Sequence, residues 1–157
     1  EIVYGFGVSA SYRGYDFSVF MQGVARTSFF INPNDISPFV DERNALNVIA
    51  GNHWSINNPD PNAFWPRLST YAIANNEQQS TWWQRDGDFL RLKNLEIGYT
   101  FPESENGIFS DINTRIYFTG LNLLTFSKFD LWDTEMGGNG LGYPPQKVYN
   151  IGLQVNF

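Results

Sequence analysis

The chain has 157 residues, enough for one ordinary domain, and its 10 basic against 16 acidic residues give a net charge of −6, which argues against nucleic acid as a partner. The absence of cysteine excludes disulfides, thiolate catalysis and cysteine-bound zinc. Aromatic residues make up 17% of the chain, yet no run approaches the roughly 20 apolar residues of a membrane helix, because the apolar residues are interleaved with polar ones.

The first 24 residues predict a β-hairpin. Residues 2–13 alternate between large apolar and small polar side chains, which is the period of a strand with two different faces. Residues 15–24 alternate in the same way, except that Phe20 falls among the polar residues. Arg13 and Gly14, between the two runs, predict a tight turn in which glycine supplies a positive φ.

Residues 25–85 show no sustained period and are rich in proline and asparagine. We predict one short helix here, over about residues 38–49, with Ser37 as its N-cap and Pro38 in its first turn. A connection of this length is usually functional or disordered, and its tryptophans argue against disorder. They are Trp54, Trp65, Trp82 and Trp83.

Residues 86–102 contain the clearest strand pattern. One face of the predicted strand carries Leu95, Ile97, Tyr99 and Phe101, and the other carries Asn94, Glu96, Gly98 and Thr100. In a soluble sandwich the apolar face is buried and the polar face meets water. In a membrane barrel the apolar face meets lipid and the polar face lines the lumen. The alternation alone leaves both architectures open.

Two further strands follow. A turn over about residues 102–112 leads to a long strand over residues 113–126, whose later half is ambiguous in phase. A loop rich in glycine leads to a closing run that alternates without exception. The prediction is therefore all-β and antiparallel, with strands at about residues 2–13, 15–24, 88–101, 113–126 and 148–157.

The connections between these strands alternate in length. Short turns follow the first and third strands, whereas long loops, residues 25–87 and 127–147, follow the second and fourth. This asymmetry is typical of outer-membrane barrels, which have short periplasmic turns and long outer loops. Five strands cannot close a barrel, because the smallest has about eight, and an open edge in lipid costs several kcal/mol for each unpaired backbone group. We therefore expect either a fragment of a larger barrel or a soluble protein.

Catalysis finds little support in these residues. His53 is the only histidine and no G-x-S-x-G motif accompanies it, so a structural role is favoured. The G-N-G-L-G run at residues 138–142 is followed by prolines rather than by a helix, which argues against a phosphate loop. No EF-hand spacing occurs, and acidic residues in loops are commonplace. We predict no catalytic residue, no cofactor and no metal. No signal peptide begins at Glu1, so an exported protein would be represented by a processed or truncated piece.

Four segments, in order along the chain, resemble the C-terminal part of SusC/RagA-like proteins. These are TonB-dependent outer-membrane transporters that work with a SusD-like surface lipoprotein. The resemblance covers nearly the whole chain and is weakest over residues 29–51. The segments are WSINNPDPNAFWPRLS (54–69), FLRLKNLEIGYTFP (89–102), RIYFTGLNLLTFSKFDLWDTE (115–135) and GLGYPPQKVYNIGLQVNF (140–157). The second resembles the family signature, through Leu90, Arg91, Leu92, Lys93, Asn94, Gly98, Tyr99 and Pro102.

The resemblance implies the C-terminal strands of a large transmembrane β-barrel in the outer membrane, with the plug domain and the other strands outside this chain. It also implies active import of oligosaccharides or peptides, energised by TonB through the missing N-terminal part, under a SusD-like lid. The chain would supply wall strands that contact outer-membrane lipid, and no enzyme activity. The alternative is a soluble, secreted, aromatic-rich β-sandwich that binds carbohydrate, and a glycoside hydrolase fragment is more distant.

Three tryptophans in the predicted outer loops are candidates for contact with the cargo or the lid, because flat aromatic faces stack well on sugars and side chains. They are Trp82, Trp83 and Trp132. Packing of the long loop is the favoured role for any single ring. Trp54 and Trp65 lie in a segment that resembles the family whatever its substrate, which implies a scaffold role.

Charged residues on and beside the strands allow further expectations. Glu96 and Arg115 fall on the predicted luminal faces of adjacent strands, where we expect them to pair with the plug. Arg91 and Lys93 lie just outside the apolar band. They either meet lipid phosphate at the membrane surface or are solvated.

The closing strand carries one more candidate site. Many outer-membrane barrels end in an aromatic residue after an alternating strand, and the assembly machinery reads that strand. The pattern here consists of Tyr149, Ile151, Leu153, Val155 and Phe157. The resemblance therefore implies an assembly signal. The alternative is that Phe157 is only the last core residue of a strand, since chain ends usually tolerate change.

Overall fold

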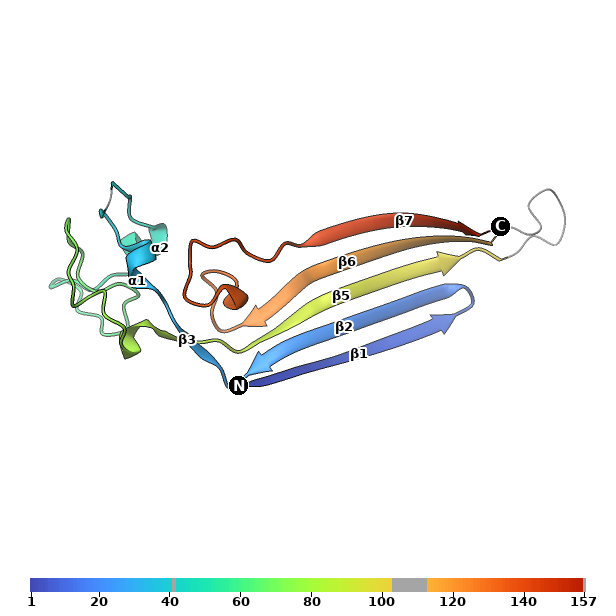
Figure 1. The fold of residues 1–157 in the computed structure, drawn as a ribbon, viewed down its shortest axis with the longest axis horizontal. Coiled ribbons are helices and arrows are strands. Elements are labelled where there is room, and N and C mark those ends of the chain that lie inside the picture. The colour runs from blue at the N-terminus through green and yellow to red at the C-terminus, as the bar shows by residue number, and fades with distance from the viewer. Residues whose placement is uncertain (41, 103–112, 157) are drawn as a thin grey trace. The chain divides into compact units, whose positions relative to one another are not determined.

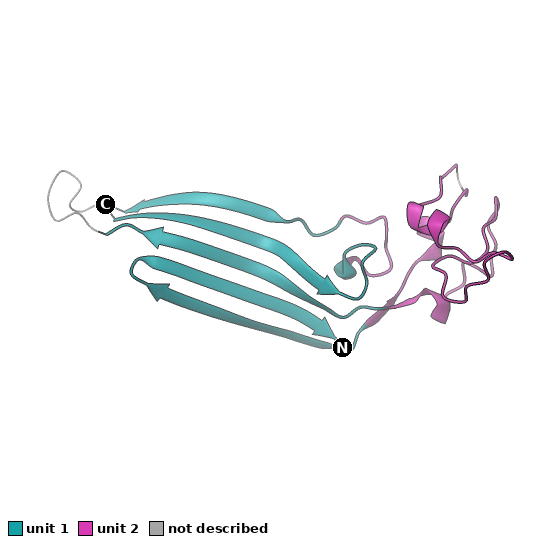
Figure 2. Cartoon of the chain, turned by 180° about the vertical axis from the view of Figure 1, so that it is seen from behind, with its two compact units in different colours: residues 1–27, 86–135, 144–157 teal, residues 28–85, 136–143 magenta. Residues whose placement is uncertain are grey.

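The computed structural model describes residues 1–40, 42–102 and 113–156. The chain divides into two compact units (Figure 2). The sheet unit comprises residues 1–27, 86–135 and 144–157, and the loop unit comprises residues 28–85 and 136–143. None of the helices among the described residues is long and apolar enough to cross a membrane.

Five long strands form one antiparallel sheet in the sheet unit (Figure 1). They pair in the order of the sequence, as the alternation predicts. Arg13 and Gly14 form the predicted tight turn, with φ angles of 48° and 86°. The predicted turn over residues 102–112 lies outside the described residues from residue 103 onward. The strands are β1 (Ile2–Tyr12), β2 (Tyr15–Ala25), β5 (Phe89–Thr100), β6 (Asn113–Ser127) and β7 (Val148–Asn156).

The register gives this sheet two chemically different faces. The apolar face carries Tyr4, Phe6, Val8, Tyr12, Tyr15, Phe17, Val19, Leu95, Ile97, Tyr99, Ile116, Phe118, Tyr149, Ile151, Leu153 and Val155. The polar face carries Ser9, Ser11, Asp16, Ser18, Gln22, Asn94, Glu96, Thr100, Arg115, Thr119, Asn150, Gln154 and Asn156. Phe20, the exception on the polar face, lies over two glycines of β1. A methyl group added at Gly5 would lie 2.9 Å from the Phe20 Cζ, and a methyl group added at Gly7 would lie 3.2 Å from the Phe20 Cδ2.

One extra residue in β5 interrupts the alternation. Phe20 pairs with Asn94, whereas the next residue of β2, Met21, pairs with Leu92. The pairing with β6 also skips Lys93. Lys93 is therefore the extra residue of a β-bulge, a feature that changes which face the following side chains occupy.

The bulge places Arg91 on the polar face, where its register partners are Gln22 and Thr125. Strict alternation continued from Leu95 would have placed it on the apolar face. A matching irregularity occurs in β6, where Asn122 has a φ of 52°. This irregularity explains why the later half of β6 is ambiguous in phase.

Within the described residues of the sheet unit, neither face of the sheet is covered along the middle of the strands. Figures 1 and 2 show the two sides, and no other described element of the sheet unit crosses them there. On the apolar face Phe6 is 54%, Ile97 47% and Ile151 80% exposed. Full burial of one such side chain is worth about 1.5–3 kcal/mol. The apolar face therefore needs an apolar cover that the described residues do not supply.

The loop unit has a small core of its own. Trp65 and Trp83 are buried with their ring centroids 5.1 Å apart, and Ile31, Ile49 and Phe64 are also buried. Its elements are β3 (Ser28–Phe30), α1 (Pro33–Ile36), α2 (Asn47–Gly51), η1 (Thr81–Trp83) and β4 (Gln84–Asp86), with β3 paired to β4. The 3₁₀ turn η2 (Thr134–Met136) follows β6. The long connection is therefore packed, as its tryptophans predict.

The predicted helix over residues 38–49 is wrong. Phe39 and Glu42 have φ angles of 63° and 61°, in the left-handed region that a right-handed helix cannot contain. Two short helices form instead: α2, which overlaps the predicted range only at its end, and α1, which precedes it. The N-cap of α1 is Asn32, whose side chain accepts a hydrogen bond from the Asn34 N–H. Ser37 lies at the C-terminal end of α1.

The two faces can be distinguished with spin labels in the full-length protein reconstituted in a lipid bilayer. The chain has no cysteine, so single cysteines can be introduced at Ile97 and Ile151 on the apolar face and at Thr119 and Asn150 on the polar face. We expect the first pair to be accessible to oxygen and the second pair to a polar relaxation reagent. Water-like accessibility at both Ile97 and Ile151 would contradict a lipid-facing sheet.

Candidate functional site

The dimensions of the sheet fit a membrane wall. Its strands have 9 to 15 residues, and a transmembrane strand needs about 9–11. With lipid against the apolar face, the polar face becomes the surface that lines the interior of a barrel. The candidate site is this polar face, where two arginine clusters lie at different positions along the strands.

The first cluster joins three strands. Arg115 of β6 donates from Nε to Asp16 Oδ1 of β2 at 3.0 Å and from Nη2 to Glu96 Oε1 of β5 at 2.6 Å, and Nη2 also contacts Asp16 Oδ2. These side chains are 21–40% exposed, so solvent weakens each ion pair. The cluster therefore adds little stability, and its main effect is to orient the three side chains across the strands. Within the described residues Arg115 is paired with Asp16 and Glu96 in the sheet. The expected pairing of Glu96 and Arg115 with the plug, which lies outside this chain, stays a prediction.

Gly98 is what allows this cluster to form. A methyl group at Gly98 would lie 2.5 Å from Arg115 Nη2 and 2.6 Å from Asp16 Oδ1. The arginine therefore crosses β5 directly above the glycine to reach the strand beyond. A glycine is needed here for close approach, and this gives Gly98 of the signature segment a physical role.

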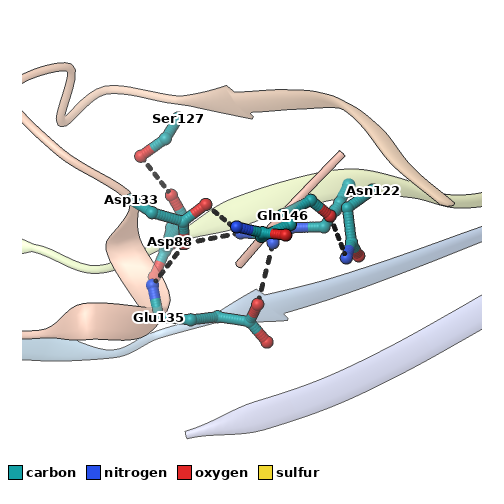
Figure 3. A network of polar contacts seen from close by, with 7 residues as sticks. Asp88, Asn122, Ser127, Asp133, Glu135 and Gln146 are labelled. Atoms are coloured by element: carbon teal, nitrogen blue, oxygen red, sulfur yellow. Dashed lines mark hydrogen bonds and ion pairs between the residues drawn. The ribbon is translucent and has the colours of Figure 1, made fainter. Parts of the chain in front are cut away.

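The second cluster is centred on Arg91, near the start of β5, and includes Asp133 and Glu135, which Figure 3 labels. Arg91 is 1% exposed, and its Nη2 lies 2.6 and 2.7 Å from the two carboxylate oxygens of Asp133. Its Nη1 lies 2.9 Å from Glu135 Oε2, and the guanidinium lies over the Phe89 ring at 5.4 Å. A buried cation is stable only when it is paired in this way. Both expected environments for Arg91, lipid phosphate and free solvation, are therefore wrong, because the bulge at Lys93 turns it toward the carboxylates.

Other contacts hold the segment that carries these carboxylates. The Asp133 carboxylate also accepts the Glu135 N–H at 3.0 Å, and Ser127 Oγ donates to the Asp88 carbonyl at 3.0 Å (Figure 3). Lys128 Nζ donates to Asp86 Oδ2 at 2.8 Å. This hydrogen bond holds the pKa of the Asp86 carboxyl below its usual value and raises the pKa of Lys128. The Lys128 side chain is 81% exposed, so this pair is worth little on its own.

The three candidate tryptophans differ in how much ring surface they offer. Trp83 is 1% exposed and donates from Nε1 to the Asn76 carbonyl at 2.9 Å, so its ring packs the loop unit. Trp82 is half-buried and donates to the Phe64 carbonyl at 3.3 Å. Trp132 is also half-buried and meets the Phe129 ring edge-on at 4.8 Å. Trp82 and Trp132 keep exposed surface, and Trp83 does not.

Comparisons with known proteins agree with this geometry. No family model matches the sequence. A TonB-dependent receptor of Formosa agariphila is 26% identical to this chain, in an alignment that covers all of this chain and 17% of the receptor. A second TonB-dependent receptor from the same organism is 34% identical, over 46% of this chain and 9% of that receptor. A structure of the RagAB peptide transporter superposes with a TM-score of 0.74 at 28% identity, over 98% of this chain and 17% of that chain. The RagAB peptide importer in its open-open state gives a TM-score of 0.71 at 25% identity, over 99% of this chain and 17% of that chain.

Along its whole length the chain is similar to one part of a TonB-dependent receptor and of the RagAB transporter. It spans 17% of the length of the curated relative that it matches from end to end. In the five-stranded sheet, β1 and β7 are edge strands with one unpaired side each. Unpaired backbone groups are not tolerated in lipid, so in a membrane wall both edges would have to pair with further strands. A soluble sandwich would need a second sheet on the apolar face, and the described residues of the sheet unit supply none.

Gly98→Ala in the full-length receptor tests the crossing of Arg115 over β5. The added methyl must displace the Arg115 and Asp16 side chains, so we expect the barrel to lose about 1–3 kcal/mol of stability. The loss is measured as a lower temperature for the shift between folded and unfolded bands in heat-modifiability electrophoresis. Gly51→Ala is the matched control, because a methyl group there meets nothing within 4 Å. Equal transition temperatures for the two variants would show that the close approach is unimportant.

Proposed function

We propose that the receptor containing this segment imports oligosaccharides or peptides across the outer membrane, with energy supplied through TonB and a SusD-like lipoprotein covering its outer mouth. The observation that carries the proposal is the superposition of a sheet with one apolar and one polar face onto RagAB over 98% of this chain. The receptor relatives agree with it, since they are named as receptors rather than as enzymes.

Peptides have the more specific support as cargo. The similar solved structures are described as a peptide importer, in an open-open and a closed-closed state. Those descriptions support a transporter that changes between open and closed states. Oligosaccharides remain the second candidate, supported by the exposed ring surface of Trp82 and Trp132, since aromatic faces stack on sugars.

The part played by this chain is structural rather than chemical. Its five strands form part of the wall, with the Arg13–Gly14 turn in the periplasm and the loops over residues 25–87 and 127–147 outside. Trp82 and Trp132 contribute to the surface that meets the cargo or the lid. Trp83 keeps the loop unit folded, because its ring is buried.

Growth of a strain that lacks the receptor tests the proposal. The strain would be complemented with the full-length receptor and grown on a peptide digest or on a mixture of neutral oligosaccharides as sole carbon source. We expect one of the two to support growth only with the receptor, and only while TonB and the SusD-like partner are present. Growth on both without the receptor, or with the receptor but without TonB, would contradict the proposal.

The closing strand supplies a second test. Tyr149, Ile151, Leu153 and Val155 share the apolar face of β7, whereas Phe157 lies outside the described residues. On the strength of the family resemblance, these residues form the strand that the barrel assembly machinery reads. Phe157→Ser in the full-length receptor should therefore lower the amount of heat-modifiable barrel in the outer membrane more than Asn156→Ser, which changes the polar face. Equal amounts for both variants would remove Phe157 as an assembly signal.

A further inference from the structure

Arg91 connects the wall to the segment that follows β6, and it does so from the polar face. Its position there follows from its register with Gln22 and Thr125. Its two ion-pair partners, Asp133 and Glu135, both belong to the segment of residues 128–135. The carboxylates must therefore lie on the polar side of the sheet, where the guanidinium is.

The segment is held closely at this position. Arg91 is 1% exposed and the Asp133 side chain 16%, so their contact is sheltered from water on both sides. Glu135 at the C-terminal end of the segment pairs with Arg91, whereas the Lys128–Asp86 pair at the other end is largely exposed and holds the segment little. Between these two ends lies Trp132, stacked edge-on against Phe129, which is 8% exposed.

We propose that Arg91 is a positioning residue that holds residues 128–135 against the polar face at the outer end of the wall, so that Trp132 and the neighbouring carboxylates line the path by which cargo enters. The inference rests on the proposed function, because the polar face lines that path only if the sheet is part of a transporter wall. It goes further by assigning the path-lining role to one segment and the holding role to one arginine.

The ion pairs explain why one side chain can have this effect. Removal of Arg91 alone leaves the Asp133 and Glu135 carboxylates without their cation at a buried site. This destabilises the native structure far more than removing all three charges together. The segment then leaves the wall to bring Asp133 and Glu135 into water. Local opening of this kind exposes the backbone to proteases without unfolding the rest of the barrel.

The experiment uses the full-length receptor with Arg91→Met, and with Lys128→Met as a control that breaks only the exposed pair. Three quantities are measured: the folded receptor by heat-modifiability, cleavage by chymotrypsin between Phe129 and Trp132, and growth on the carbon source that the wild-type receptor supports. For Arg91→Met we expect cleavage to rise about tenfold and growth to fall several-fold, at a folded amount near that of the wild type. Lys128→Met should match the wild type in all three.

A triple variant, Arg91→Met with Asp133→Asn and Glu135→Gln, separates holding from simple charge balance. It has no uncompensated charge, so it should fold even where Arg91→Met does not. The triple variant lacks the ion pairs but also lacks the uncompensated carboxylates, so its cleavage and growth should lie between those of Arg91→Met and the wild type. Wild-type cleavage and growth in a folded Arg91→Met receptor, or in the triple variant where Arg91→Met does not fold, would overturn the inference. Failure of the wild-type receptor to support growth would instead overturn the proposed function, whereas the cleavage result does not depend on any nutrient.

Discussion

A sheet that separates two different surroundings has no interior of its own. In the sheet unit a single layer of backbone carries apolar side chains on one face and polar side chains on the other. The hydrophobic effect, which builds an ordinary domain from within, stabilises this sheet only when an apolar surrounding, such as lipid, covers the apolar face. Within the chain, the strands are held by backbone pairing and by contacts between side chains on the same face. The loop unit is different, because Trp65 and Trp83 give it a buried core.

The two arginines of the polar face, Arg115 and Arg91, connect different parts of the structure. Arg115 links three neighbouring strands and is partly exposed, so its ion pairs orient the Asp16 and Glu96 side chains more than they stabilise the sheet. Arg91 ties a loop to a strand and is almost completely buried. Its ion pairs are the stronger constraint, because a buried cation without its partners is costly. The difference follows from position: one cluster lies along the wall, and the other lies under a covering segment.

Much of this architecture could be predicted from period and composition. The five strands, their antiparallel order and the turn at Arg13 and Gly14 follow from strict alternation and from the left-handed preference of glycine. The pairing of Arg115 with Asp16 could not be predicted, because the two residues are 99 positions apart and the contact depends on the register of three strands. The environment of Arg91 was missed for a different reason, since periodicity assumes a regular ladder and does not detect a single extra residue.

The false helix over residues 38–49 has a similar cause. Ser37 followed by Pro38 is a sound local start signal, but Phe39 and Glu42 adopt left-handed conformations that no local preference of those residue types suggests. Packing of the loop unit overrides local propensity there. Asn32, which does cap a helix, stands immediately before Pro33, so the same kind of signal was present one turn earlier.

The bulge at Lys93 also determines how the length of β5 can vary. Elsewhere in the strand, deleting one residue would move every following side chain to the opposite face of the sheet. Apolar side chains would then lie on the polar face, and polar side chains on the apolar face. Lys93 is the exception, since it has no register partner in β2 or β6. Deleting it would leave Asn94 and Arg91 on the faces that they already occupy. In proteins similar to this chain, a strand shorter by one residue is therefore most easily accommodated at this position, and other changes of length belong in the loops.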